Sequence, residues 1–64
     1  MSRELEIKLT IESAELDLKL LKLEEFIESP AMSELQPYAA ELLQEQYEVM
    51  CSYLKILEKR IDLL

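Results

Sequence analysis

The sequence predicts an all-α fold, a two-helix antiparallel hairpin that assembles into a homo-oligomeric helical bundle. Glycine is absent and the only prolines are Pro30 and Pro37, so one short break separates two long segments. Within both segments, apolar residues recur at intervals of three and four, as on one face of an α-helix. Each segment also carries more apolar residues than one partner helix can cover, which predicts assembly with further copies.

The first helix is expected over about residues 3–28, with apolar rows on opposite sides. Its inner row consists of Leu5, Leu9, Leu16, Leu20, Leu23 and Ile27. The outer row consists of Ile7, Ile11, Ala14, Leu18 and Leu21. At roughly 100° per residue, the two rows point in opposite directions. Such a helix needs an apolar neighbour on both sides, and one hairpin supplies only one of them.

Residues 4–11 are open to two interpretations, because the stretch "LEIKLTI" alternates apolar and polar residues as a half-buried β-strand does. Ile7, Thr10 and Ile11 suit a strand, and Ser13 is able to cap a shorter helix. Glutamate, lysine and leucine favour a helix, and the chain offers no second strand for pairing. A helix is therefore favoured over an inter-subunit β-strand. Either structure needs a second chain to complete it.

The break and the second helix follow from the two prolines. Pro30 disfavours helical geometry at Ser29, so the first helix should end near Glu28. A hinge is expected over residues 29–36, followed by a second helix over about 37–63. Pro37 suits the first helical position, where its missing N–H would have no partner in any case. The chain is thus expected to form a single helical-hairpin domain over residues 1–64.

The second helix also carries two rows, separated by roughly 90° at 3.6 residues per turn. Its inner row consists of Leu43, Tyr47, Met50, Leu54, Leu57, Ile61 and Leu64. The lateral row consists of Leu42, Gln46, Val49, Tyr53, Ile56 and Arg60. The inner row fits the first helix of the same hairpin, and the lateral row fits another copy.

Oligomerisation is the expected source of stability for a chain of 64 residues. Small domains bury little surface and usually need disulfides, a metal or association. Cys51 is the only cysteine and histidine is absent, so neither an internal disulfide nor a metal site is expected. The predicted oligomer interface consists of Ile7, Ile11, Leu18, Leu21, Val49 and Ile56.

Composition argues against several classes of function. A net charge of −7 repels nucleic acid and anionic membranes. The chain contains no long apolar run and no basic segment leading into one, so a membrane span and a signal peptide are not expected, and the cytoplasm is the expected compartment. Without histidine, a glycine-rich phosphate loop or a serine elbow, no enzymatic activity and no cofactor are expected.

Two groups of residues are candidates for binding a ligand. Gln46, Tyr53 and Arg60 recur at intervals of seven on the lateral row. Arginine binds phosphate or carboxylate through its planar fork, and tyrosine is able to stack on a base. The three residues are therefore interpreted either as a polar pocket formed by several subunits or as the rim of an interface, where tyrosine and arginine are enriched.

The second group lies on one flank of the first helix. Lys8, Lys19 and Lys22 share this flank with Phe26, and together they are able to hold a phosphate and stack a base. The alternative is an ordinary helix edge, with Lys19 paired to Glu15. Both alternatives stay open at the level of the sequence.

The stretches "ELDLKLLKLEEFIESP" and "ELLQEQYEVMCSYLKILEKRIDLL" resemble a family of small helical proteins of unknown function from crAss-like and other bacteriophages. The leading "MSRELEIKLTIES" lies outside this resemblance. The resemblance implies a phage accessory protein that acts inside a bacterial host and has no established enzymatic activity. By analogy with small oligomeric phage proteins, the first hypothesis is an anti-defence protein that sequesters a nucleotide-like immune signal. The alternatives are a module that docks on a host or phage protein and, less favoured, an RNA-binding hairpin dimer.

Overall fold

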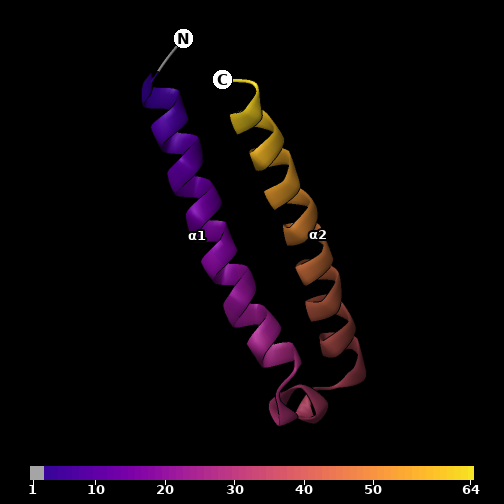
Figure 1. Cartoon of the computed structure of the whole chain (residues 1–64). Helices are drawn as coiled ribbons and strands as arrows, with labels where there is room; N and C mark the ends of the chain where they lie inside the picture. Colours follow the sequence, from indigo (N-terminus) through magenta and orange to yellow (C-terminus); the bar gives the residue numbers. More distant parts are fainter. Residues whose placement is uncertain (1–2) are drawn as a thin grey trace.

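The computed structural model describes residues 3–64 as two long helices joined by a short turn. Helix α1 spans Arg3–Ile27, the 3-10 helix η1 spans Pro30–Glu34, and helix α2 spans Pro37–Asp62. The helices pack side by side in opposite directions, so the start of α1 and the end of α2 both lie at the end of the hairpin away from the turn (Figure 1). The molecule is a rod of 48 × 15 × 12 Å. The predicted all-helical hairpin is confirmed, and residues 3–64 contain no strand.

Residues 4–11 belong to α1, so the helical interpretation of "LEIKLTI" is confirmed. Leu9 is buried against α2, whereas Ile7 and Ile11 lie exposed on the other side of the helix. The alternating apolar residues therefore face two opposite sides of one helix. Thr10, which suits a strand, is accommodated because its Oγ1 donates a hydrogen bond to the carbonyl oxygen of Glu6 at 2.8 Å.

The turn is held by short-range hydrogen bonds around its two prolines. Both the backbone N–H and the hydroxyl of Ser29 donate to the carbonyl oxygen of Phe26, at 3.0 and 2.6 Å. The hydroxyl of Ser33 donates to the carbonyl oxygen of Pro30 at 2.7 Å within η1. Pro37 then opens α2, where a residue without an N–H leaves no donor unpaired.

The core is formed where the two inner rows meet. Leu9, Leu16 and Leu20 of α1 are buried, and Leu57 of α2 is completely inaccessible to solvent. A second set of residues is partly buried against this core, namely Tyr47, Met50, Cys51, Leu54 and Ile61. The expectation that Leu64 extends the inner row is wrong, because α2 ends at Asp62 and Leu64 is exposed beyond it. Few residues therefore hold one hairpin together.

The outer and lateral rows are left uncovered by the hairpin. The exposed fractions of the six predicted interface residues, Ile7, Ile11, Leu18, Leu21, Val49 and Ile56, lie between 50% and 62%. Exposed apolar residues that gather along one side of a helix mark an interaction site more often than single exposed apolar residues do. The inner rows account for the fold of the hairpin, and the other rows remain available to a partner.

A side-chain hydrogen bond joins the two helices on one side of the core. The hydroxyl of Tyr47 donates to Oε2 of Glu24 at 3.0 Å. This bond raises the pKa of Tyr47 from 10.0 to about 12, because the carboxylate stabilises the protonated phenol, with smaller contributions from the Cys51 thiol and from desolvation. The pair also shows the register of the two helices, since Tyr47 lies level with Glu24.

Replacement of Tyr47 by phenylalanine is expected to lower the melting temperature at neutral pH, because it removes this bond. A pKa that is raised on folding stabilises the protein fully below the unfolded value of 10.0, and that stabilisation is lost as the pH rises towards about 12. Melting curves of the wild type and Tyr47→Phe should therefore converge over that interval. Tyr38→Phe, which alters an exposed tyrosine, is the matched control. A constant difference across that pH range would contradict the assignment.

Candidate functional site

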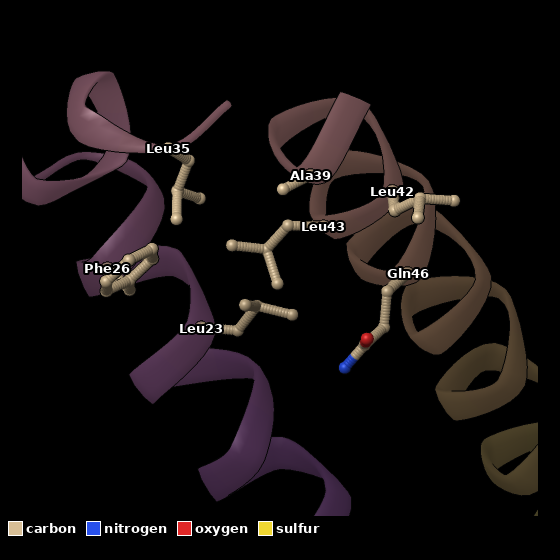
Figure 2. Close-up of a pocket in the computed structure, with 7 residues that line it drawn as sticks. All are labelled: Leu23, Phe26, Leu35, Ala39, Leu42, Leu43 and Gln46. Atoms are coloured by element: carbon tan, nitrogen blue, oxygen red, sulfur yellow. The ribbon is translucent and has the colours of Figure 1, made fainter. Parts of the chain in front are cut away.

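A surface depression lies between α1 and α2 beside the turn, and it is lined mainly by small and apolar side chains. Its volume is about 510 Å³. This turn-end groove is lined by Leu23, Phe26, Leu35, Ala39, Leu42, Leu43 and Gln46. Figure 2 shows the ring of Phe26 on the α1 side and the amide of Gln46 reaching from α2 into the space between the helices. Gln46 is the one polar side chain among these seven.

The groove shows that the two predicted groups of ligand-binding residues share one side of the hairpin. Phe26 of α1 and Gln46 of α2 both line it. Lys22 and Lys19 precede Phe26 by four and seven residues, so they lie on the same flank of α1, followed by Lys8 further along. Tyr53 and Arg60 follow Gln46 at intervals of seven on α2. We call this side, defined by Lys8, Lys19, Lys22, Phe26, Gln46, Tyr53 and Arg60, the basic face.

The register brings lysines level with the polar residues of α2. Tyr47 lies level with Glu24, and each residue advances about 1.5 Å along its helix in opposite directions. Tyr53 is therefore level with the residue next to Lys19. By the same step, Arg60 lies within about one turn of Lys8. The basic face is thus a strip with Lys8, Lys19 and Lys22 on α1, where Glu4 and Glu15 lie among them, and with Gln46, Tyr53 and Arg60 on α2.

The strip is open to solvent in a single hairpin. All six predicted ligand-binding residues, Lys8, Lys19, Lys22, Gln46, Tyr53 and Arg60, are exposed. Nζ of Lys8 lies 3.3 Å from Oε1 of Glu4, an exposed ion pair of the kind that contributes little to stability. Nε2 of Gln46 donates to the Sδ of Met50 at 3.7 Å, and a thioether is a weak acceptor. These side chains are therefore available to a ligand, while enclosure of that ligand requires a second surface.

Sequence reasoning missed the groove itself, although it placed Phe26 and Gln46 near ligand-binding residues. Leu23 and Leu43 belong to the inner rows, and Leu35 belongs to the turn, so none of them signals a site. The signal that the sequence does carry is Ala39, a small residue three and seven positions before Leu42 and Gln46. A small side chain at that position leaves space opposite Phe26, where a leucine would fill it.

Comparison with known families adds one finding to this geometry. The model of the Sequestin family matches residues 4–63. The chain belongs to the Sequestin family. No curated protein and no solved structure matches it at the required significance. The match includes both helices, the turn and residues 4–14, which lie outside the bacteriophage resemblance. The name of the family is compatible with a sequestering role, and it suggests binding rather than catalysis.

The side of this Sequestin-family hairpin opposite the basic face is acidic. A smaller groove of about 260 Å³ lies there, between the helices and away from the turn, and Asp17 and Glu58 are among the residues that line it. Glu24 follows Asp17 by seven residues on the same flank of α1. Acidic residues are not confined to this side, since Glu4 forms an ion pair with Lys8 and Glu15 lies one turn before Lys19 on the flank of the basic face.

Two other features, a membrane-spanning helix and a metal site, are absent from residues 3–64 of this Sequestin-family chain. Neither helix within residues 3–64 is long and apolar enough to cross a membrane. Over the same part of the chain, no group of three or more histidine, cysteine or acidic residues is placed to hold a metal ion. Cys51 is a free, partly buried cysteine that packs against the core.

Proposed function

We propose that the chain is a non-enzymatic phage accessory protein that sequesters a small nucleotide-like immune signal in the cytoplasm of a bacterial host. The pocket lies between subunits of a homo-oligomer. One observation carries the proposal: the lysine flank and the row of Gln46, Tyr53 and Arg60 lie on the same side of the hairpin, next to uncovered apolar residues. The family name, Sequestin, supports a role in binding.

The uncovered apolar residues explain how an open strip becomes a pocket. Val49 and Ile56 alternate with Gln46, Tyr53 and Arg60 along the lateral row of α2, and both are more than half exposed. A second copy that covers Val49 and Ile56 necessarily comes close to the polar tips between them. The ligand is then enclosed at a subunit boundary, which allows such a small chain to surround a charged molecule.

The chemistry of the strip favours a small anion with an aromatic part. Arg60 and the lysines bind phosphate, and Tyr53 supplies a ring on which a base stacks. The chain as a whole is acidic, so its net charge of −7 would repel a long nucleic acid that extends beyond the strip. A nucleotide-like signal fits both observations, and the charge tells against the RNA-binding hairpin dimer.

Arg60→Ala is expected to abolish capture of such a signal while the oligomer persists. The purified protein is mixed with a nucleotide extract of phage-infected bacteria, washed and heat-denatured, and the released nucleotides are identified by mass spectrometry. Lys59→Ala, which removes a neighbouring exposed cation outside the lateral row, is the matched control and should retain capture. Tyr53→Ala removes the ring on which the base stacks and should also lose the ligand in the same assay. Equal release from the wild type and Arg60→Ala would contradict the proposal, as would no release from the wild type.

A second candidate function is supported by the outer row of α1. Ile7, Ile11 and Leu18 lie opposite the core, away from the lateral row of α2, and they are exposed. An apolar helical surface of this kind is able to dock on a host or phage protein and inhibit or scaffold it. Capture of one specific host protein, unaffected by added nucleotides and lost in Leu18→Glu, would favour this function over sequestration.

A further inference from the structure

We infer that two copies of the chain pack antiparallel through the lateral rows of α2, and that each ligand pocket is shared between them. Tyr53 and Arg60 of one copy form one side of a pocket, and Gln46 and Lys22 of the other copy form the second side. This inference rests on the proposed function, because it names the partner that closes the proposed pocket. The two-fold arrangement gives two equal pockets per pair of chains.

The hairpin exposes enough surface for one standard interface. Its solvent-accessible area is 5168 Å². A folded monomer of 7.5 kDa exposes roughly 4,200 Å², so the excess is about 900 Å² per chain. A stable pairwise interface buries about 800 Å² on each partner. The excess is therefore of the size that one further copy of the chain removes.

The charges along α2 favour an antiparallel second copy. On the side of α2 away from α1, the half of the helix near the turn carries Glu41 and Glu45, and the other half carries Lys59. A parallel copy would set like charges against each other, whereas an antiparallel copy sets carboxylates against the lysine. When Val49 of each copy lies opposite Ile56 of the other, Glu45 is level to within one residue with Lys59 of the other copy.

The same alignment is complementary on α1. The register of the two helices places the centre of the alignment level with Lys19 to within one residue. An antiparallel copy about this centre places Glu15 level with Lys22 of the other copy. Both residues are exposed on the flank of the basic face. The carboxylate that lies among the lysines therefore meets a cation of the other copy rather than a second carboxylate.

The alignment brings together polar residues that are far apart in one hairpin. Gln46 and Arg60 are separated by two intervals of seven residues, which is about 21 Å along α2 and more than a mononucleotide spans. In the antiparallel pair, Gln46 of one copy is level to within one residue with Arg60 of the other. Lys22 of the same copy lies midway between the levels of Tyr53 and Arg60 of the other. These groups converge only when the second copy is present.

A mixture of two inactive variants tests whether the pockets are shared. Arg60→Ala and Gln46→Ala are each expected to lose capture in the assay with the nucleotide extract. The two proteins are then unfolded together, refolded as an equal mixture and assayed again. We expect about a quarter of the wild-type capture to return, because half of the pairs contain one copy of each variant, and each such pair has one intact pocket of its two.

A mixture of Arg60→Ala and Tyr53→Ala is the matched control. Both changes fall on the same side of the pocket, so every pocket of a mixed pair stays defective and no capture should return. If the mixture of Arg60→Ala and Gln46→Ala captures no more than either variant alone, the shared pocket is overturned. Full capture by Gln46→Ala alone would also overturn it.

Cross-linking tests the antiparallel alignment without any ligand. Val49→Cys and Ile56→Cys are each introduced into a chain that also carries Cys51→Ser, and the two proteins are refolded together and oxidised. Antiparallel copies bring position 49 against position 56, so mass spectrometry should find disulfide-linked dimers that contain one chain of each kind. Linked dimers of identical chains only, or no linked dimers, would overturn the alignment.

The two tests separate this inference from the proposed function. Mixed disulfide dimers without any nucleotide in the extract assay would overturn sequestration and the shared pocket, and would leave the alignment standing. Capture that depends on Arg60 but does not return in the mixture with Gln46→Ala would overturn the shared pocket and leave sequestration standing.

Discussion

Leu57→Asp is expected to abolish folding of the hairpin at all accessible protein concentrations. Leu57 has no solvent-exposed surface and sits among Leu9, Leu16 and Leu20, where a carboxylate finds no partner. Replacement of a buried leucine by alanine already lowers the free energy of unfolding by about 2–5 kcal/mol. The whole free energy of unfolding of a domain of this size is roughly 3–10 kcal/mol, at about 0.05–0.15 kcal/mol per residue. The aspartate adds the cost of burying a charge or of protonating it.

Far-ultraviolet circular dichroism measures this loss directly as a collapse of helical signal. Leu63→Asp is the matched control, because Leu63 belongs to the same end of the chain but is 86% exposed. That variant should keep the helical signal and the melting temperature of the wild type. A folded Leu57→Asp protein would show that the inner rows do not form the core, and the arrangement of both helices would have to be revised.

Leu18→Glu is expected to break the oligomer without touching the core of the hairpin. Leu18 lies on the outer row of α1, on the side away from α2, and is 59% exposed in the hairpin. In the proposed assembly a neighbouring copy covers it. An uncompensated buried charge costs about 3–5 kcal/mol, so the association constant should fall by about 100-fold or more.

Sedimentation velocity over a range of concentrations measures this effect, with circular dichroism on the same samples. Gln44→Glu is the control, since it introduces the same charge at an exposed polar position on α2. It should sediment like the wild type. A Leu18→Glu protein that sediments like the wild type would remove the outer row from the interface, and would leave that surface to a partner other than this chain.

Much of the hairpin follows from local sequence signals. Pro30 and Pro37 define the break, and the spacing of Leu16, Leu20 and Leu57 selects the surfaces that meet. The helical structure of residues 4–11 follows from the same reasoning, because alternating apolar residues face two opposite sides of a helix. The extent of the core is less predictable. Leu64 fits the spacing but lies past the last turn of α2, where spacing no longer determines position.

The candidate site is less predictable, since it depends on how two helices face each other. Helical spacing alone groups Gln46 with Tyr53 and Lys22 with Phe26. Only the packing of α1 on α2 shows that both groups share one side, and that Phe26 and Gln46 line one groove. The cross-helix bond from Tyr47 to Glu24 shows the register of the two helices, and no local signal in the sequence predicts such a pairing.

Native mass spectrometry of the protein purified from phage-infected bacteria, repeated after denaturation, tests the central claim most directly. Sequestration in a pocket between subunits predicts an oligomer that carries additional small-molecule mass, and denaturation should release that mass and leave the 7.5 kDa chain. A monomer of 7.5 kDa under native conditions would contradict it, because a single hairpin leaves both the apolar rows and the basic face open to solvent.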